Sequence, residues 1–418
     1  MTRIRLQLTA LAPLSFSARR GTASAFTDTL NYLPGTALRG AAAACYLRNI
    51  GEPTDEHFRN LFLSDGILFA NLYPQLRDDK GVSQALPATS RSCKAHRGFL
   101  EDSSTDDKTH GVGDILMPAA VFEMLGDKNI LNDVAQCPRC SQPTHQFTGF
   151  YERAPDAAVY SKVDVYKRHL PHVGINRRTQ TAEEGVLYAQ EVINEARREK
   201  PDQPYRPQRF SGDLIVQEQH VEFVKETLLA EDATLWVGES RSRGLGRVQV
   251  SECAITATDD DTKLKGRIAA FNQQFSELSR GATGRTFISL TLQSDAIMQD
   301  AFMRPKTHLE AEDLARAVGD GNANAQSLLS LRLVYANVGT RLVQSWNVAS
   351  GYPKPDDVAI RMGSVFLLEA PEGMRDDLAR SLAALQDGSV GKRRSEGFGR
   401  LTVCDPFHME VKELWQTI

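Results

Sequence analysis

The chain has 418 residues, of which 41% are hydrophobic and 24% are charged, a balance typical of a soluble globular protein with two or three domains. Its formal net charge of −4 argues against a protein that binds nucleic acid through overall charge, but it allows a local basic groove. The start of the chain alternates in polarity like a strand, unlike a signal peptide, and no apolar run reaches the roughly 20 residues of a membrane span. We therefore expect a cytoplasmic protein with reduced thiols and no membrane partner.

Strand-like and helical patterns follow one another at the start of the chain. Ile4, Leu6 and Leu8 alternate with polar residues, which predicts a half-buried strand over residues 3–9. Residues 32–40, Tyr-Leu-Pro-Gly-Thr-Ala-Leu-Arg-Gly, join a turn to an alanine-rich run that favours a helix.

Residues 76–150 differ in composition from their surroundings, because they are rich in Asp, Ser, Thr and Gly. This composition predicts an insertion, partly mobile, within a first domain. After a proline-broken loop at 194–209, alternation predicts a strand at 210–216, helical spacing follows at 221–230, and another strand runs through 248–250.

A second series of elements begins after residues 256–285, which predict a domain junction that contains a helix. We therefore expect a first domain over residues 1–255 and a second over 286–418. The second series consists of strands or strand-like segments at 288–292, 331–346, 363–369 and 400–404 and of a helix at 374–386.

One glycine–arginine loop occurs twice, 153 residues apart. Loop 1 is residues 238–247, Gly-Glu-Ser-Arg-Ser-Arg-Gly-Leu-Gly-Arg, and loop 2 is residues 391–400, Gly-Lys-Arg-Arg-Ser-Glu-Gly-Phe-Gly-Arg. Each follows a predicted helix and precedes a predicted strand, which indicates a duplicated unit. The six identical positions pair Gly238 with Gly391, Arg241 with Arg394, Ser242 with Ser395, Gly244 with Gly397, Gly246 with Gly399, and Arg247 with Arg400.

The residue types of both loops suit an anionic partner. Glycine allows sharp turns and close approach, backbone N–H groups can face a phosphate, and guanidinium offers a planar donor fork. The absence of Gly-Lys-Ser/Thr argues against a P-loop, and the order helix, loop, strand argues against a dinucleotide fingerprint. A tight structural turn with solvated arginines is the alternative interpretation. The predicted contact residues are Gly238, Arg241, Ser242, Arg243, Gly244, Gly246 and Arg247 in loop 1, and Lys392, Arg393, Arg394, Ser395, Gly397, Gly399 and Arg400 in loop 2.

Two pairs of metal-binding residue types lie in the insertion, Cys93-Lys-Ala-His96 and Cys137-Pro-Arg-Cys140. Two such pairs suit a structural, tetrahedral zinc ion, and reduced thiols favour zinc over a disulfide. A closed set of four ligands leaves no open position for catalysis. A redox pair and a metal-free turn are the alternative interpretations. The rivals of His96 as the fourth ligand are His110 and His145.

The loop pattern Gly-x-x-x-Ser-x-Gly-x-Gly-Arg resembles the glycine-rich signature of the RAMP superfamily of CRISPR-associated proteins. Residues 32–40 resemble the segment that opens the first helix in that family. Residues 173–188, with Val-Gly-Ile-Asn-Arg-Arg-Thr and Gly-Val-Leu-Tyr, are similar to a second family segment. Length, order and the cysteine-bearing insertion are most similar to the large RAMP subunit of type III-D effector complexes, the Csx-ten group.

The resemblance implies an α+β fold with two ferredoxin-like (RRM-like) domains in tandem and a zinc-binding insertion in the first. It implies a non-catalytic subunit that holds guide RNA (crRNA) at its repeat-derived 5′ end through phosphate contacts and base stacking. The implied protein partners are the large subunit, the backbone RAMP subunits and the small subunit of the complex. Further candidate RNA contacts are Arg19, Arg20, Arg39, Arg177 and Arg178, while Tyr32 and Phe398 are candidates for stacking or for core packing.

Two constellations support the alternative of a ribonuclease that cuts target RNA or guide precursor. Related backbone subunits use an aspartate in the loop before the Pro-Gly segment, and Asp28 lies there, with a solvated or capping role as the other interpretation. His169 and His172, near Arg168 and Arg177, could act as general acid and base, or could be ordinary surface histidines. A protein–protein scaffold without RNA contact is a further alternative.

Overall fold

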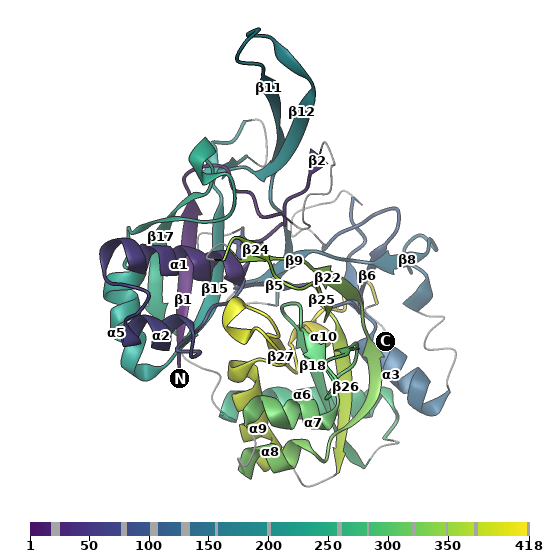
Figure 1. Cartoon of the computed structure of the whole chain (residues 1–418). Helices are drawn as coiled ribbons and strands as arrows, with labels where there is room; N and C mark the ends of the chain where they lie inside the picture. The colour runs from purple at the N-terminus through teal and green to yellow at the C-terminus, as the bar shows by residue number, and fades with distance from the viewer. Residues whose placement is uncertain are drawn as a thin grey trace.

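The chain folds into two halves, each built on an antiparallel sheet packed against helices (Figure 1). Arg19 and Arg20 lie outside the described part of the chain. No helix among the described residues is long and apolar enough to cross a membrane. The computed structural model describes residues 1–17, 26–76, 82–100, 108–126, 134–154, 158–198, 202–256, 261–281, 284–319, 323–347, 350–371 and 375–415.

The first half is organised around β1 (Thr2–Ala10), whose alternation is visible in the sequence. Ile4, Leu6 and Leu8 are buried against the helices, and the pleat turns Arg3 and Arg5 to the opposite face. The sheet order is β16-β17-β1-β15-β3, and β4 also pairs with β15. The other strands are β16 (Thr234–Trp236), β17 (Arg247–Ile255), β15 (Arg209–Val216), β3 (Ile67–Leu68) and β4 (Tyr73–Gln75), and the helical elements are α1 (Gly35–Asn49), α2 (Glu56–Phe62), a 3-10 turn (Glu218–His220), α5 (Val221–Phe223) and a π-helical turn (Val224–Leu228).

The second half has a four-stranded sheet in the order β21-β26-β18-β27. The segment predicted as a domain junction is largely helix α6, and its Phe271 and Phe275 are fully buried in the core of this half. That core therefore begins before residue 286. The strands are β18 (Arg285–Leu292), β21 (Arg332–Asn337), β26 (Val365–Pro371) and β27 (Leu401–Val403), and the helices are α6 (Asp261–Leu278), α7 (Ala311–Val318), α8 (Ala323–Leu328) and α9 (Arg375–Gly388).

The two sheets have the same connectivity. When the four strands common to both sheets are numbered in chain order, each sheet has the order fourth, first, third, second. This order is β17-β1-β15-β3 in the first half and β27-β18-β26-β21 in the second half. A helical segment separates the first strand from the second in both halves, and another separates the third from the last. The duplicated loops therefore belong to duplicated frameworks.

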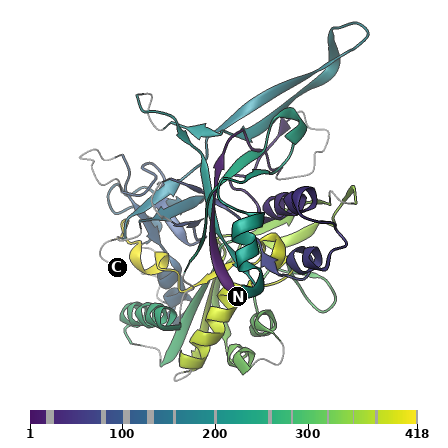
Figure 2. The same ribbon diagram turned by 90° about the vertical axis from the view of Figure 1, so that its left-hand side faces the viewer.

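A β-hairpin is inserted at the same point of both frameworks, between the second and third strands. In the first half, β11 (Lys167–Ile175) and β12 (Ala182–Ile193) form a long hairpin that projects from the molecule, as Figures 1 and 2 show. In the second half, the shorter hairpin is β22 (Thr340–Val343) with β25 (Asp357–Ile360), extended by β23 (Trp346–Asn347) and β24 (Tyr352–Pro353). The remaining short strands are β2 (Phe26–Thr27), which pairs with β12, and the pairs β13 (Ala196–Arg197) with β14 (Arg206–Pro207) and β19 (Met298–Gln299) with β20 (Pro305–Lys306).

The described parts of the predicted insertion take part in two small sheets, in the orders β10-β9-β5 and β7-β6-β8, and the first of these sheets extends past residue 150 through β9 and β10. Its helix α3 contributes Leu116 and Ala120 to the core of the second half, and the backbone N–H groups of Leu100 and Val112 donate to the Glu413 carboxylate, 3.0 Å away. These contacts connect the insertion to the second half and to the C-terminal segment around Glu413. The strands of these two sheets and the neighbouring helices are β5 (Val82–Ala85), β6 (Ser90–Cys93), β7 (Val112–Asp114), α3 (Leu116–Leu125), β8 (Thr144–Gln146), β9 (Phe150–Arg153), β10 (Tyr160–Val163) and α10 (Phe407–Glu410).

A buried ion pair joins the insertion to α10. The Nδ1 of His408 lies 3.2 Å from Oδ2 of Asp114, and Nε2 of His408 lies 2.8 Å from the Thr291 hydroxyl. Burial lowers the pKa of His408, but the Asp114 carboxylate outweighs burial and the net pKa is raised. Burial likewise raises the pKa of Asp114, but His408 outweighs it and the net pKa is lowered.

We expect this pair to make stability depend on pH. Because the pKa of folded His408 is raised, its contribution is complete below the ordinary histidine pKa and is lost as the pH rises through the raised value. At pH 6, His408→Gln should lower the free energy of unfolding by about 3 kcal/mol, since a buried carboxylate loses its partner. The difference from the parent chain should shrink at pH 9. The control is His308→Gln, at a half-exposed histidine beside Glu310. A pH-independent difference in denaturant unfolding would contradict the assignment.

Candidate nucleic-acid interface and metal centre

Loops 1 and 2 have the same backbone conformation. Each contains four residues with positive φ at matching positions. Two of these residues precede and two follow a 3-10 turn, which is Arg241–Arg243 in loop 1 and Arg394–Glu396 in loop 2. A left-handed backbone favours glycine, which occupies three of the four positions in each loop. The matching φ values are 74° and 77° for Gly238 and Gly391, 55° and 58° for Ser240 and Arg393, 88° and 93° for Gly244 and Gly397, and 87° and 74° for Gly246 and Gly399.

Each loop is held by backbone hydrogen bonds to the segment after the first strand of its half. In loop 1, the N–H groups of Glu239 and Gly246 donate to the carbonyls of Ser15 and Pro13, at 3.0 and 2.9 Å. In loop 2, the N–H groups of Lys392 and Gly399 donate to the carbonyls of Ile297 and Asp295, both at 2.9 Å. A Cβ atom at Gly238 or Gly391 would collide with the carbonyl of Ser15 or Ile297, so the close approach requires glycine at both positions.

The side chains of loop 1 face solvent beside the long hairpin. Arg241, Ser242, Arg243 and Arg247 are exposed. Within the described part of the chain, no side-chain hydrogen bond or ion pair of Arg241 or Arg247 is present, whereas Arg243 donates to the Tyr188 hydroxyl and lies 5.9 Å from the centre of its ring. The three guanidinium groups are therefore available to an anion from solvent.

A row of flat side chains continues from loop 1 along the hairpin. Tyr188 on β12 stacks on His172 on β11, with ring centres 4.9 Å apart and an interplanar angle of 23°. These residues are direct cross-strand partners, and Gln190 two residues along accepts a hydrogen bond from Ser240 of loop 1 at 3.3 Å. The resulting surface, Arg243–Tyr188–His172, was not predicted as a unit. We call it the hairpin ledge.

Loop 2 has the same backbone conformation, but its charged side chains interact with neighbouring residues of the chain. Arg393 forms ion pairs with Glu396 at 2.7 Å and Asp357 at 3.3 Å, and its guanidinium lies 4.8 Å from the Phe398 ring centre. Burial raises the pKa of Glu396, but Arg393 and Lys354 outweigh burial and lower it. These charged side chains form ion pairs with one another. Loop 2 therefore presents fewer cationic hydrogen-bond donors to an anion from solvent than loop 1 does.

The other cations of loop 2 also have partners within the chain. Arg394 donates to the carbonyls of Ala317 and Gly388 at 3.4 and 3.5 Å, and Lys392 donates to Gln299. Arg400 reaches the interior between the halves, and Ser395 is half-buried. The two loops, both predicted as RNA contacts, therefore share a backbone conformation but differ in the exposure of their arginines.

Loop 2 packs against the Pro-Gly segment at the start of α1. A Cβ atom on Gly35 would lie 2.8 Å from the carbonyl oxygen of Glu396 and 3.0 Å from Cα of Gly397. Tyr32, just before this segment, is buried among aromatic rings, including Tyr73 at 5.8 Å. Two motifs that are far apart in the sequence thus meet at the junction of the halves, and Tyr32 serves core packing.

The remaining predicted RNA contacts are scattered. Arg39 donates to the carbonyl of Phe62 at the end of α2, which is a structural role. Arg177 and Arg178 are exposed in the turn at the tip of the long hairpin, and Asn176 accepts the N–H of Arg178 at 2.9 Å in that turn. The tip and loop 1 therefore lie at opposite ends of the same hairpin.

The structure does not assemble the histidine pair proposed for a ribonuclease. His169 and His172 are three residues apart on β11, so their side chains leave opposite faces of the hairpin. His169 contacts Phe26, with ring centres 4.9 Å apart, and its Nε2 lies 3.9 Å from the Glu191 carboxylate. Asp28 is exposed. The two histidines cannot act together as general acid and base on one substrate.

Four side chains of the insertion converge in a cluster that could hold a metal ion. The Sγ atoms of Cys93, Cys137 and Cys140 and a ring nitrogen of His110 all lie within 4.8 Å of one another. The Sγ atoms of Cys93 and Cys140 are 3.5 Å apart, and Nδ1 of His110 is 3.3 Å from Sγ of Cys137. Tetrahedral zinc with ordinary bond lengths sets these separations at about 3.6–3.8 Å. The donor set and its spacing fit zinc.

The fourth member of the cluster is His110, and this corrects the prediction of His96. The His96 ring instead stacks on the His110 ring, with centres 4.1 Å apart, and its carbonyl accepts the His110 N–H at 3.0 Å. His145, the other alternative, is exposed on β8 and lies outside the cluster. His110 was recognisable in the sequence only as one of three alternatives, because no spacing rule links it to either pair.

Comparison with known proteins places the chain in a family. A model of the RAMP superfamily matches residues 21–249, and a model described as CRISPR-associated protein (Cas_Cmr3) matches residues 166–405. No curated protein sequence matches the chain. A chain of the type III-B Cmr-beta complex bound to cognate target RNA is 9% identical with a TM-score of 0.41, covering 87% of this chain and 86% of that chain. A Cas6 product complex is 13% identical with a TM-score of 0.31, covering 48% of this chain and 79% of that chain. Because each family model extends over more than half of the sequence, the chain belongs to the RAMP superfamily of CRISPR-associated proteins.

Proposed function

We propose that this protein is a structural subunit of a type III CRISPR effector complex and that it holds guide RNA across loop 1 and the hairpin ledge. The observation that carries the proposal is the exposed set Arg241, Arg243 and Arg247 beside the stacked pair Tyr188 and His172. Membership of the RAMP superfamily supports the CRISPR context.

The chemistry of the surface suits single-stranded RNA. Guanidinium groups bind phosphate oxygens, and flat side chains stack with unpaired bases. The backbone N–H groups of a glycine-rich turn add neutral donors to the same phosphates. Recognition of the repeat-derived 5′ end, the type III-D subgroup and docking on the large, backbone and small subunits belong to the same proposal and rest on the sequence resemblance.

We further propose that the two halves are duplicated ferredoxin-like units. The common strand order and the matched loop backbones support this proposal. In such a unit, one sheet face packs on helices, and the loops at the strand ends carry ligand contacts. We place the boundary within residues 256–285, and α6 packs with the second unit.

We propose a structural Zn²⁺ ion held by Cys93, His110, Cys137 and Cys140. Bound there, the ion would supply four strong bonds that tie β6 to the turn over residues 137–140. Three thiolates and one imidazole form a closed tetrahedral set, so the site suits folding and not catalysis. A binding role agrees better with the separated His169 and His172 than ribonuclease activity does.

The test of RNA binding uses Tyr188→Ala in the full chain. We expect single-stranded repeat-derived RNA to bind about 10–100-fold more weakly, because stacking contributes about 1–3 kcal/mol per base. Tyr188→Phe should keep nearly the parental affinity, since the ring remains. Fluorescence anisotropy with labelled RNA measures the dissociation constants.

The matched control is Tyr205→Ala. Tyr205 is also an exposed tyrosine beneath an arginine, Arg198, whose guanidinium lies 4.8 Å from its ring centre, but it lies between β13 and β14 and not on the long hairpin. Its replacement should leave RNA affinity unchanged. Equal affinity of the parent, Tyr188→Ala and Tyr205→Ala proteins would overturn the assignment of the ledge.

A further inference from the structure

A small pocket of about 250 Å³ lies where the insertion, α6 and the C-terminal segment meet. The insertion contributes Asp114, Val134 and two residues of α3, α6 contributes the part that contains Gln274, and the C-terminal segment contributes residues between His408 and Trp415. Loop 1 and the hairpin ledge belong to the first half. The pocket is therefore distinct from the surface proposed to hold RNA.

The wall of this pocket is largely apolar. It includes the flat indole ring of Trp415, which is only 6% exposed and packs with the cysteines of the metal cluster. An aromatic face beside aliphatic side chains suits a planar ligand, because flat rings stack on one another. The apolar lining residues are Met117, Pro118, Val134, Leu278, Val411 and Trp415.

Two polar side-chain atoms of the residues that line this pocket are buried without a hydrogen-bond partner. They are the indole Nε1 of Trp415 and the amide Oε1 of Gln274, and neither has a partner within the described part of the chain. The first atom can only donate a hydrogen bond, and the second can only accept one. Because a buried polar group without a partner costs stability, a donor and an acceptor at one pocket point to a ligand that satisfies both.

The charged residues around the pocket balance one another. Its lining contains two carboxylates, those of Asp114 and Glu277, and two basic side chains, those of His408 and Lys412. His408 forms the buried ion pair with Asp114, while Glu277 and Lys412 are exposed. A pocket with this balance favours an uncharged ligand, because an additional buried charge would have no counter-charge.

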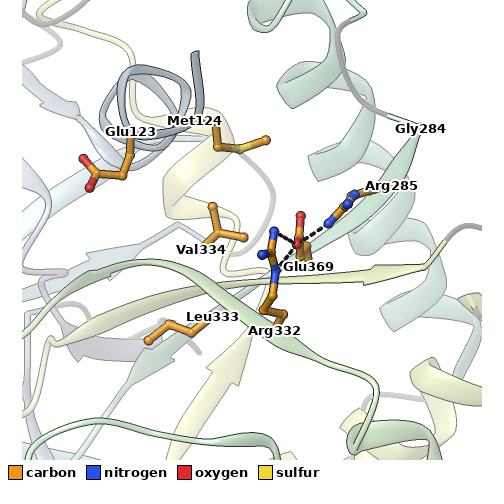
Figure 3. A pocket seen from close by; sticks show the side chains of 8 residues that line it. All are labelled: Glu123, Met124, Gly284, Arg285, Arg332, Leu333, Val334 and Glu369. Carbon is orange, nitrogen blue, oxygen red and sulfur yellow. Dashed lines mark hydrogen bonds and ion pairs between the residues drawn. The ribbon is translucent and has the colours of Figure 1, made fainter. Parts of the chain in front are cut away.

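The larger pocket shown in Figure 3, about 400 Å³ in volume, differs in its hydrogen bonding. Its Arg285 and Arg332 both point to the buried carboxylate of Glu369 and form ion pairs with it. Among the described residues that line it, no buried side-chain donor or acceptor lacks a partner. The polar groups of that pocket are satisfied within the chain, whereas the smaller pocket leaves one donor and one acceptor unsatisfied.

The volume of the smaller pocket fits a molecule of two fused rings. A dry cavity of about 150 Å³ in another protein binds benzene, so the additional volume here leaves room for a second ring. Sites for drug-sized ligands begin at about 300 Å³. A larger molecule could therefore place only one of its ring systems inside.

We propose that this pocket binds a small, uncharged, planar heterocycle of purine size. The indole N–H of Trp415 would donate to an acceptor atom of the heterocycle, and the amide oxygen of Gln274 would accept from a ring N–H or an amino group. The apolar wall would cover the faces of the ring. The heterocycle belongs either to a free base or nucleoside or to an unpaired base of an RNA strand, because both present the same ring.

The first experiment measures binding of three two-ring molecules to the full chain by titration calorimetry. Adenine offers both a donor and an acceptor, quinoline offers only an acceptor, and indole offers only a donor. In the parent chain all three should bind at millimolar concentration or below, because each fits the volume and satisfies at least one of the two atoms. Binding of none of them overturns the proposal and is the result expected of a pocket that holds only water.

Two substitutions connect each molecule to its own contact. Gln274→Leu removes the acceptor and should weaken binding of adenine and indole at least about 5-fold, but binding of quinoline less than 2-fold. Trp415→Phe removes the donor and should weaken binding of adenine and quinoline more than binding of indole. An equal loss for all three molecules in both variants, or no loss in either variant, overturns the assigned contacts.

The matched control is Gln326→Leu, at an exposed glutamine on α8 outside the pocket. It should change all three affinities less than 2-fold, and a loss equal to that of Gln274→Leu overturns the site. Thermal unfolding of each ligand-free variant accompanies the titrations. Because Oε1 of Gln274 has no hydrogen bond to lose, Gln274→Leu should unfold near the parental temperature, and it decides the case in which Trp415→Phe does not fold.

A competition experiment separates the two sources of the heterocycle. Displacement of adenine by a short oligoadenylate assigns the pocket to a base of an RNA strand. Displacement by adenosine, but not by the oligoadenylate, assigns it to a free molecule. Tyr188→Ala should leave adenine binding unchanged, so failure of this site and failure of the RNA-binding proposal give different results.

Discussion

Simultaneous replacement of Arg241, Arg243 and Arg247 by alanine is expected to weaken binding of single-stranded RNA at least about 100-fold. Hydrogen bonds to charged groups contribute about 1.5–3 kcal/mol each, and three are removed together. The exposure of all three side chains means that little folding energy depends on them. Anisotropy titrations of the full chain with repeat-derived RNA measure the change.

The salt dependence gives an independent measure of the same contacts. Each phosphate contact with a single strand contributes about 0.7 to the slope of log affinity against log salt concentration, so three lost contacts should lower the slope by about 2. The control is Lys392→Ala, because Lys392 is an exposed cation of loop 2 that already donates to Gln299. A similar loss of affinity in both variants would contradict the difference between the loops.

Loss of metal is expected to have the largest effect on stability. Metal binding to a structural zinc site supplies on the order of 10 kcal/mol, and this energy stabilises the fold that presents the ligands. Cys137→Ser should therefore abolish stoichiometric zinc and unfold the region around β6 and β7. The buried cysteines pack with Leu414 and Trp415, so hydrogen exchange should also increase in the segment over residues 411–415.

The histidine variants decide which residue is the fourth ligand. His110→Ala should lose zinc, whereas His96→Ala should retain it, because His96 stacks outside the cluster. Cys45→Ser serves as a control for loss of a cysteine, since Cys45 lies on α1 in the first half. Metal content by mass spectrometry gives the result. Retention of zinc by His110→Ala together with its loss from His96→Ala would contradict the structure.

Local sequence patterns predicted the elements that local forces determine. The alternation at Ile4, Leu6 and Leu8 predicted β1, and the Pro-Gly turn before an alanine-rich run predicted the start of α1. The long hairpin was missed in the sequence, because both of its faces are largely exposed and its residues do not alternate between apolar and polar. A strand without a buried face leaves little periodic signal.

The sequence predicted less completely those features that depend on contacts between residues far apart in the chain. The matched loops were similar in sequence, but the Pro-Gly segment of the first half packs on loop 2, whereas the arginines of loop 1 are exposed in the described part of the chain. His169 and His172 were predicted as a candidate acid–base pair, but β11 places their side chains on opposite faces of the hairpin. The cluster that could hold a metal ion contains His110 and not His96, whose carbonyl accepts the His110 N–H.

The sequence by itself determined that this protein contains a repeated glycine–arginine turn, because glycine at left-handed positions and at points of close approach is a local requirement of the backbone. Its Cys-x-x-His and Cys-x-x-Cys spacings also predicted three of the four residues of the cluster that could hold a metal ion. Only the tertiary structure decided that loop 1 presents its arginines to solvent, that Arg400 faces an interior cavity, and that His110 completes the cluster. Charge compensation and exposure depend on residues hundreds of positions away, and these come together only when the two halves pack.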